Sequence, residues 1–361
     1  MHILLATGIF PPAIGGPATY STKLAEEFLK LGHTVTVVTY GRMLMIEDQR
    51  LKIVFVAKSG NVLSRWMRYR KALLQYGENA DAVIALSSVS TGIPLLLSGL
   101  RKPKKILRLG GEFFWERYTD AGGMKSLREW YRTRFGLWRL INTCLMEAIL
   151  QSFDRIVYST EFQQKIHEHA YAALPQSTVI ENASLTCAPA GATVGRPHHP
   201  FKLLFMGRFV GFKNLPTLLD AVASLPEVSL TLVGCGPLEG RLRARAGLLG
   251  LGSRVEFHPP VSGEEKRRMF VEHDALILPS VTEISPNVAL EAASEGLPVL
   301  LSEETGLKEG GNILLKSLRK KSDIIQSLRE YMEDSDVSKG AMDVRTYAQV
   351  AQDWIQLLAS L

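Results

Sequence analysis

Short apolar runs alternate with stretches of helical periodicity along most of the chain. Residues Ile3–Thr7 form a short apolar run, and Leu24, Phe28 and Leu31 then repeat at helical spacing. The β-branched and aromatic run Thr34–Tyr40 predicts a second strand. Further strands are predicted at Ile53–Val56, Ala82–Leu86, Lys105–Leu109, Arg155–Ser159 and Thr178–Glu181. Because strands and helices alternate, we expect a parallel sheet covered by helices on both faces.

A segment rich in Pro, Gly and Ala, residues 186–200, interrupts this alternation, and we interpret it as a linker because no periodicity survives there. The alternation then restarts. Strands are predicted at Lys202–Met206, Ser229–Val233, Arg254–His258, Ala275–Leu278 and Val299–Leu301. Helices are predicted at Leu215–Leu225, Leu238–Leu249, Gly263–Glu272 and Pro286–Glu295. The pattern therefore predicts two Rossmann-like, doubly wound α/β domains, residues 1–190 and 200–344, followed by an amphipathic helix within residues 345–361. Since ligands of open α/β sheets bind beyond the carboxyl ends of the strands, we expect the site in a cleft between two facing domains.

The net charge of the 361 residues, +6, is concentrated in the first half of the chain. Residues 1–195 contain 23 Lys and Arg against 15 Asp and Glu, a balance of +8, whereas the remainder holds 19 and 21, a balance of −2. The basic half could face phosphates, an anionic membrane or nucleic acid. The basic and aromatic runs Arg65–Lys71 and Lys125–Phe135 fit either helix faces with Arg lying over apolar contacts or a face for a membrane surface. No known nucleic-acid-binding module is present, so nucleic acid is not expected as a partner.

Cysteine usage and the apolar runs indicate the compartment. Cys144, Cys187 and Cys235 are too few and too scattered for a disulfide framework or a zinc site. The N-terminus has no basic region, and Pro11-Pro12 interrupts its apolar run, so it does not resemble a signal peptide. No window has the ~18 uninterrupted apolar residues of a spanning helix. We expect a cytoplasmic protein, or one that lies on the inner face of the membrane.

The first candidate for ligand binding is the loop that contains Gly15 and Gly16, before Pro17. Neither glycine has a side chain, so a ligand can approach the backbone closely. The helix expected to follow presents free N–H groups and the positive end of its dipole, which suits an anion. The alternative is a simple tight turn. The loop lacks the spaced G-x-G-x-x-G fingerprint, which disfavours a nicotinamide or flavin enzyme.

Two cations follow a predicted strand directly, in the stretch Met206–Asn214. Arg208 can bind two phosphate oxygens at once, and Lys213 adds a mobile point charge. The alternative is a pair of solvated surface cations. Because both lie at the carboxyl end of a strand, we interpret them as ligands of a diphosphate.

Two glutamates stand eight residues apart in the stretch Thr282–Gly296. Ser285 and Pro286 suit the cap and the first position of a helix, which places Glu283 just before that helix. Glu291 then lies ~5 residues into it, roughly 7 Å along the axis. Carboxylates only accept hydrogen bonds, which suits vicinal hydroxyls, and the N–H groups near Asn287 and Val288 suit a phosphate. This pattern describes a nucleotide sugar. The alternative reading of Glu291 as a solvated charge is weakened by its apolar neighbours.

The ordered set of motifs resembles the family-4 glycosyltransferases of the GT-B fold. The matching motifs are E-x7-E at Glu283–Glu291 with E-A and G-L-P-V after it, G-R-F-x3-K at Gly207–Lys213, the glycine loop near the N-terminus, Leu230–Pro237, Val255–Val261 and Val179–Asn182. None of these motifs is specific alone. Their joint order and spacing, which extend over nearly the whole chain, are specific.

This resemblance implies a retaining, metal-independent hexosyltransferase without a cofactor, commonly one of polysaccharide biosynthesis. The C-terminal domain would bind a nucleoside-diphosphate sugar, the N-terminal domain would bind a glycan or glycolipid acceptor, and the last helix would cross back to the N-terminal domain. By the same resemblance, Arg208, Lys213 and Glu283 are the catalytic residues. Donor-binding residues would be Gly15, Gly16, Gly207, Ser285, Asn287, Val288 and Glu291. Peripheral contact with an anionic membrane is a further expectation, based on the basic runs.

The sequence departs from the family pattern at three places. The usual E-G-F-G reads E-I-S-P here, and Pro286 has no N–H to donate, so Ser285 would have to supply that hydrogen bond by its hydroxyl. No His occurs in Arg108–Glu112, where many members carry one, and Glu112 is our candidate for a polar role toward the acceptor. The Gly-rich loop expected after Gly296 is shortened. Asp334 and Asp336 form a D-x-D, but in a late polar segment, so no metal site is expected.

Two alternatives to a transferase stay open. A nucleotide-sugar epimerase could use the same scaffold. A non-catalytic nucleotide-sugar-binding GT-B protein could retain the donor site without turnover, an alternative motivated by Ile284-Ser285-Pro286.

Overall fold

The computed structural model divides the chain into two compact units, and each is described by itself. The N-terminal unit comprises Met1–Phe113, Tyr131–Asn182 and Tyr347–Leu361, and the C-terminal unit comprises Phe114–Trp130 and Ala183–Thr346. The structure describes residues 1–13, 15–41, 46–47, 49–133, 137–184, 198–333 and 344–361.

The N-terminal unit is built on an eight-stranded sheet in the order β3-β4-β2-β1-β5-β6-β7-β8. All neighbours in it are parallel except β3 and β4. Its strands are β1 (His2–Thr7), β2 (Thr34–Tyr40), β3 (Ile46–Glu47), β4 (Leu51–Val56), β5 (Ala82–Ala85), β6 (Lys104–Leu109), β7 (Arg155–Tyr158) and β8 (Ser177–Val179). The side chains of β1 from Ile3 to Thr7 are all buried, because this strand lies inside the sheet with helices on both faces.

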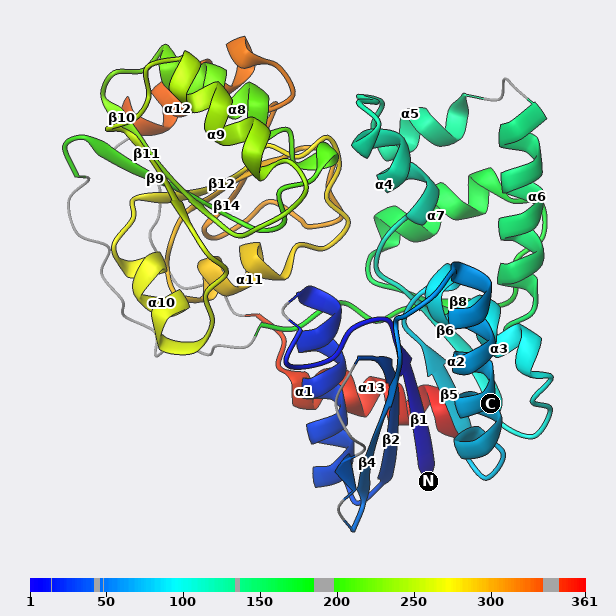
Figure 1. Cartoon of the computed structure of the whole chain (residues 1–361). Helices are drawn as coiled ribbons and strands as arrows, with labels where there is room; N and C mark the ends of the chain where they lie inside the picture. Colours follow the sequence, from blue (N-terminus) through cyan, green and yellow to red (C-terminus); the bar gives the residue numbers. More distant parts are fainter. Residues whose placement is uncertain (14, 42–45, 48, 134–136, 185–197, 334–343) are drawn as a thin grey trace. The chain divides into compact units, whose positions relative to one another are not determined.

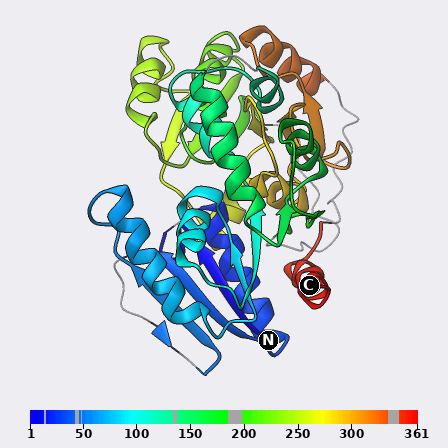
Figure 2. The ribbon, with the colours of Figure 1, turned by 90° about the vertical axis from the view of Figure 1, so that its right-hand side faces the viewer.

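Helices cover both faces of this sheet. Figure 2 shows α2 on one side and α13 on the other. Helix α13 packs against α1, where Trp354 is fully buried and its Nε1 donates to Tyr20 Oη at 2.8 Å. The helices of this unit are α1 (Gly16–Lys30), α2 (Val62–Gly77), α3 (Ile93–Ser98), α6 (Leu137–Gln151), α7 (Glu161–Ala170) and α13 (Tyr347–Ala359), with a π-helical turn at Ser88–Gly92.

The C-terminal unit has a six-stranded, fully parallel sheet in the order β11-β10-β9-β12-β13-β14. Figure 1 shows α8, α9 and α12 on one side of it and α10 and α11 on the other. The strands are β9 (Phe201–Met206), β10 (Val228–Val233), β11 (Val255–His258), β12 (Ala275–Leu278), β13 (Val299–Ser302) and β14 (Ile313–Lys316). The helices are α8 (Leu215–Ala223), α9 (Glu239–Leu248), α10 (Gly263–Val271), α11 (Asn287–Ser294) and α12 (Lys321–Glu333).

The prediction of two parallel α/β sheets is confirmed, and every predicted strand is present within two residues of its expected bounds. One division of the chain differs from the expected N-terminal domain of residues 1–190. Residues Phe114–Trp130, which we call the inserted segment, leave the N-terminal unit between β6 and β7 and group with the C-terminal unit. Helices α4 (Phe113–Asp120) and α5 (Leu127–Arg132) lie almost wholly in it. The inserted segment groups with the C-terminal unit because it makes hydrogen bonds and ring contacts with residues of that unit, which the local periodicity of the sequence does not reveal.

Candidate functional site

Two loops at the carboxyl edge of the C-terminal sheet carry most of the predicted donor residues. The β9 loop, Gly207–Asn214, follows β9, and the β12 loop, Pro279–Pro286, follows β12. Strands β9 and β12 are parallel neighbours, so both loops leave the sheet at the same edge. In open α/β sheets this edge is where ligands bind.

A buried ion pair joins the two loops. Lys213 Nζ donates to Glu283 Oε1, and the two residues are 9% and 6% exposed. Ser280 Oγ donates to the same carboxylate oxygen at 2.6 Å, and Val281 N donates to Phe212 O at 2.7 Å. Burying either charge alone would be costly, so the pair and its extra hydrogen bond hold the loops in one arrangement. The structure thus brings together two predicted catalytic residues that are 70 positions apart.

Arg208 is the exposed cation of the site. It follows β9 with only Gly207 between, and its side chain makes no ion pair with any residue in the part of the chain that the structure describes. Gly207 is half-buried, and its N–H donates to Val233 O at 3.0 Å. The guanidinium of Arg208 is therefore available to bind two oxygens of an anion in a forked geometry.

Helix α11 begins one residue later than predicted. Pro286, not Ser285, is the N-cap: its carbonyl accepts from Ala289 N at 3.0 Å and from Leu290 N at 3.4 Å, and its own side chain makes no capping hydrogen bond. The prediction that Ser285 caps the helix is wrong, because the proline carbonyl already closes the first turn. Asn287 and Val288 are half-buried in that turn, at the positive end of the helix dipole.

Glu291 is buried and paired, so it is not a solvated surface charge. Its side chain lies on α11, the residue is 4% exposed, and Oε2 accepts from Lys266 Nζ of α10. Sequence reasoning missed Lys266. It stands in the charged run Glu264–Arg268, which looks like a solvated helix face, and only the packing of α10 beside α11 reveals its partner.

The predicted glycine pair opens α1 in the N-terminal unit. Gly15 is the N-cap with φ 154°, and its carbonyl accepts from Thr19 N at 3.0 Å. A Cβ at Gly15 would lie 3.0 Å from Ile9 Cδ1, so this position favours glycine both in backbone conformation and in space. Gly16 is exposed in the first turn, and Ile14 lies outside the described residues.

Glu112 is the centre of a buried hydrogen-bond network after β6. Its Oε1 is 2.5 Å from His167 Nε2 and accepts from Gln163 Nε2 at 3.0 Å, and its Oε2 accepts from Tyr131 Oη at 3.0 Å. Burial by itself would raise the pKa of Glu112, but the neighbouring His167 and the donated hydrogen bonds lower that pKa below its usual value. Glu112 thus has a structural role at the end of β6, and its contact with an acceptor stays a prediction. His167, which the sequence reasoning missed, supplies an imidazole from α7.

The described residues contain neither a candidate metal site nor a candidate membrane-spanning helix. They contain no group of three or more His, Cys, Asp or Glu side chains placed to hold a metal ion. Asp334 and Asp336 of the D-x-D lie outside them. Among the same residues, no helix has both the length and the apolar character that crossing a bilayer requires.

Comparisons with known proteins match this chain to a family model and to a relative of known activity. The model of the family "Glycosyl transferases group 1" matches residues 200–334. A D-inositol 3-phosphate glycosyltransferase of Arthrobacter sp. (strain FB24) is 32% identical over 266 residues, which are 70% of this chain and 59% of that relative. The aligned part thus spans somewhat more than half the length of this relative.

Two solved structures share the fold. A sucrose-phosphate synthase from Thermosynechococcus elongatus superposes with a TM-score of 0.74 at 17% identity, over 99% of this chain and 94% of the other. Anabaena Alr3699/HepE, solved with UDP and glucose, gives a TM-score of 0.74 at 15% identity, over 99% of both chains. The prediction of the GT-B fold is confirmed by these matches.

Proposed function

We propose that this chain, a member of the glycosyl transferases group 1 within the family-4 enzymes of the GT-B fold, moves a sugar from a nucleoside-diphosphate sugar to a hydroxyl-bearing acceptor with retention of configuration. The observation that carries this proposal is the convergence of Arg208, Lys213 and Glu283 at one edge of the C-terminal sheet. An exposed guanidinium and a carboxylate that can accept from hydroxyls, on loops that leave the same edge of the sheet, suit a diphosphate joined to a sugar.

The proposed chemistry depends on stabilising a leaving diphosphate. The acceptor hydroxyl oxygen forms a bond to the anomeric carbon while the bond from that carbon to the diphosphate oxygen breaks. The hydroxyl proton passes to the leaving phosphate oxygen, and negative charge grows on the diphosphate. Arg208, Lys213 and the N-terminus of α11 stabilise that charge, which is electrostatic catalysis and requires neither a side-chain nucleophile nor a metal or cofactor.

The nature of the substrates rests on the relatives. A solved neighbour is described with UDP and glucose, and the curated relative is named for transfer to an inositol phosphate. These names support a nucleotide-sugar donor and a polyol, glycan or glycolipid acceptor for this chain. The excess of basic residues in the first half supports an anionic acceptor or peripheral contact with an anionic membrane from the cytoplasmic side.

A second candidate function is a nucleotide-sugar-binding protein without turnover. Pro286 stands at the N-cap of α11 and has no N–H, so one backbone donor at the phosphate end of the site is replaced by a ring. This protein would bind donor nucleotides and release no nucleoside diphosphate, whatever acceptor is present.

Release of nucleoside diphosphate tests the proposal. Wild-type protein is incubated with a panel of UDP-, GDP- and ADP-sugars, with and without polyol, glycan and glycolipid acceptors. We expect release that requires an acceptor, which an epimerase would not show. Arg208→Ala should abolish turnover without changing stability, whereas Arg241→Ala, which removes an exposed Arg of α9, should leave turnover intact. Normal turnover in Arg208→Ala would overturn the assignment.

A further inference from the structure

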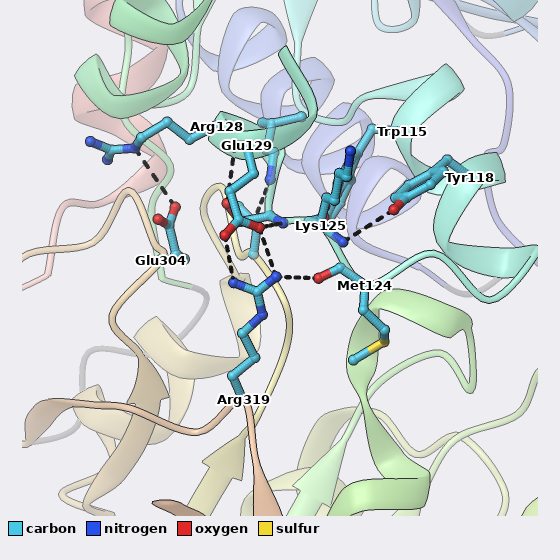
Figure 3. Close-up of polar contacts among 11 residues, drawn as sticks. Trp115, Tyr118, Met124, Lys125, Arg128, Glu129, Glu304 and Arg319 are labelled. Carbon is cyan, nitrogen blue, oxygen red and sulfur yellow. Dashed lines mark hydrogen bonds and ion pairs between the residues drawn. The ribbon is translucent and has the colours of Figure 1, made fainter. Parts of the chain in front are cut away.

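The inserted segment Phe114–Trp130 contacts both loops of the donor site. It belongs to the C-terminal unit although the chain enters it from the N-terminal unit after Phe113 and returns there at Tyr131. Figure 3 shows part of this contact, with Glu129 and Arg128 of the segment facing Arg319 and Glu304.

The first set of contacts fixes the turn that carries Lys213. Gly211 N donates to Asp120 Oδ1 at 3.0 Å, and the rings of Trp115 and Phe212 lie 5.4 Å apart at 41°. A Cβ on Gly211 would lie 2.2 Å from Thr119 O, so the backbone of the segment lies directly on this glycine. Gly211 and Phe212 form a 3-10 turn with Lys213. The position of the Lys213 side chain therefore depends on the segment.

The second set of contacts reaches Glu283. Leu127 N donates to Thr282 Oγ1 at 2.9 Å, and Leu127 is fully buried. Arg128 Nε lies 3.8 Å from Glu304 Oε2, and the backbone oxygen of Glu304 accepts from Glu283 N at 2.9 Å. The inserted segment thus contacts Thr282, which precedes Glu283, and Glu304, whose backbone oxygen binds the N–H of Glu283.

A forked ion pair completes the contact. Arg319 Nη1 donates to Glu129 Oε1 at 2.9 Å and Nη2 donates to Glu129 Oε2 at 2.7 Å, while Nη2 also donates to Met124 O. Arg319 O in turn accepts from Asn214 Nδ2 at 3.1 Å, so this pair connects back to the residue after Lys213. The hydrogen bonds from Arg319 lower the pKa of Glu129 to about 2, so the carboxylate is ionised at neutral pH. Forked pairs of this kind fix geometry more strictly than a single contact does.

We infer that the inserted segment is part of the donor site, and that Asp120 and Glu129 are positioning residues that set Lys213 and Glu283 against each other. The consequence for catalysis rests on the proposed function, whereas the positioning itself does not. The segment is anchored at its base as well, because Glu112 precedes Phe113 and accepts a hydrogen bond from Tyr131, which follows Trp130. A loop of the acceptor-side half of the sequence thus shapes the loops that hold the donor.

Hydrogen–deuterium exchange without substrate tests the positioning. Asp120→Ala and Glu129→Gln should each accelerate amide exchange in residues 211–214 and 281–284 by about fivefold, the amount expected for losing one hydrogen bond. Asp120→Asn keeps the accepting oxygen and should behave like the wild type. The matched control is Asp220→Asn, which breaks a forked pair between Arg245 of α9 and Asp220 of α8, neither of which is in the two loops. That variant should leave exchange in both loops unchanged.

Transfer kinetics then test the consequence. The donor KM should rise at least about fivefold in Asp120→Ala and Glu129→Gln, with the acceptor KM unchanged. A double variant with the charges exchanged, Glu129→Arg with Arg319→Glu, should bring the donor KM part of the way back toward the wild-type value. The inference is overturned if exchange in the two loops matches the wild type in both variants. If no sugar transfer is found with any donor, the proposed function fails and the exchange result alone decides the inference.

Discussion

Replacing Lys213 by Met tests how much the buried ion pair with Glu283 contributes to the stability of the protein. The substitution keeps an apolar stem of similar length and removes the cation that faces Glu283. Both residues are almost fully buried, and the carboxylate would retain only the hydrogen bond from Ser280. Breaking a buried ion pair by removing one partner costs about 3–5 kcal/mol, because the remaining charge is left without compensation.

The magnitude can be converted to a shift in unfolding temperature. A domain of 150–250 residues loses about 2–4 °C for each kcal/mol, so Lys213→Met should unfold roughly 6–20 °C lower than the wild type. Adding Glu283→Gln removes the buried charge itself and should recover stability to within about 1 kcal/mol, since neutral replacements of buried ion pairs are often tolerated.

Thermal and urea unfolding of the two single variants, the double variant and the wild type form a double-mutant cycle. Lys308→Met, which alters an exposed lysine of the same unit, is the control and should shift unfolding by less than about 0.5 kcal/mol. Two results would contradict a stabilising buried ion pair between Lys213 and Glu283. One is a Lys213→Met protein as stable as this control, and the other is a double variant whose loss of stability equals the sum of the single losses.

Three further predictions concern other buried groups. Because the pKa of Glu112 is lowered in the folded protein, its carboxylate contributes stability above its unfolded pKa of about 4.3 and loses it as the pH falls below that value. The stability difference between the wild type and Glu112→Gln, from urea unfolding at pH 7 and pH 4, should therefore be smaller at pH 4; an equal difference would contradict this. Trp354→Ala should cost about 3–5 kcal/mol in thermal unfolding, because the ring is fully buried and bonded to Tyr20; a loss below 1 kcal/mol would be inconsistent with that packing. Glu291→Gln should raise the donor KM about tenfold with little change in kcat, measured by initial rates, since the predicted role of this carboxylate is to accept hydrogen bonds from vicinal hydroxyls of the donor. An unchanged KM would exclude that role, and Glu295→Gln, the neighbouring buried carboxylate paired with Arg267, is the control.

The strands could be predicted from the sequence because their signal is local. Thr34–Tyr40 is a continuous β-branched and aromatic run, and the observed strand has the same bounds. The four-residue strand Ile313–Lys316 was missed, since a run so short among polar residues has no distinguishing period. Helix α12 was missed as well, although its apolar face is buried.

The candidate site could be predicted only in part. The residue types and their placement at strand ends predict a common location for Arg208 and Lys213, because parallel strands present their carboxyl ends at one edge. The pairing of Lys213 with Glu283 depends on which strands are neighbours, and the sequence does not state this. Lys266 and the inserted segment were missed for the same reason, since their partners lie on other elements.

The helix boundary at Pro286 shows a limit of capping rules. A serine followed by a proline is a common helix start, yet here the proline carbonyl makes the first helical hydrogen bond. Just before this helix, an isolated parallel β-bridge joins Glu283 of the β12 loop to Thr305, a long-range contact that a local capping rule does not include.

The most direct measurement is a calorimetric titration of the wild type, Arg208→Ala and the control Arg241→Ala with UDP, GDP and ADP. We predict one saturable site for at least one of these nucleotides in the wild type. We expect the affinity to be at least about tenfold weaker in Arg208→Ala, because a charged hydrogen bond to the diphosphate is lost, and to be unchanged in the control. Failure of the folded wild type to bind any of the three, or equal affinity in Arg208→Ala, would contradict the assignment of a nucleoside-diphosphate site to these loops.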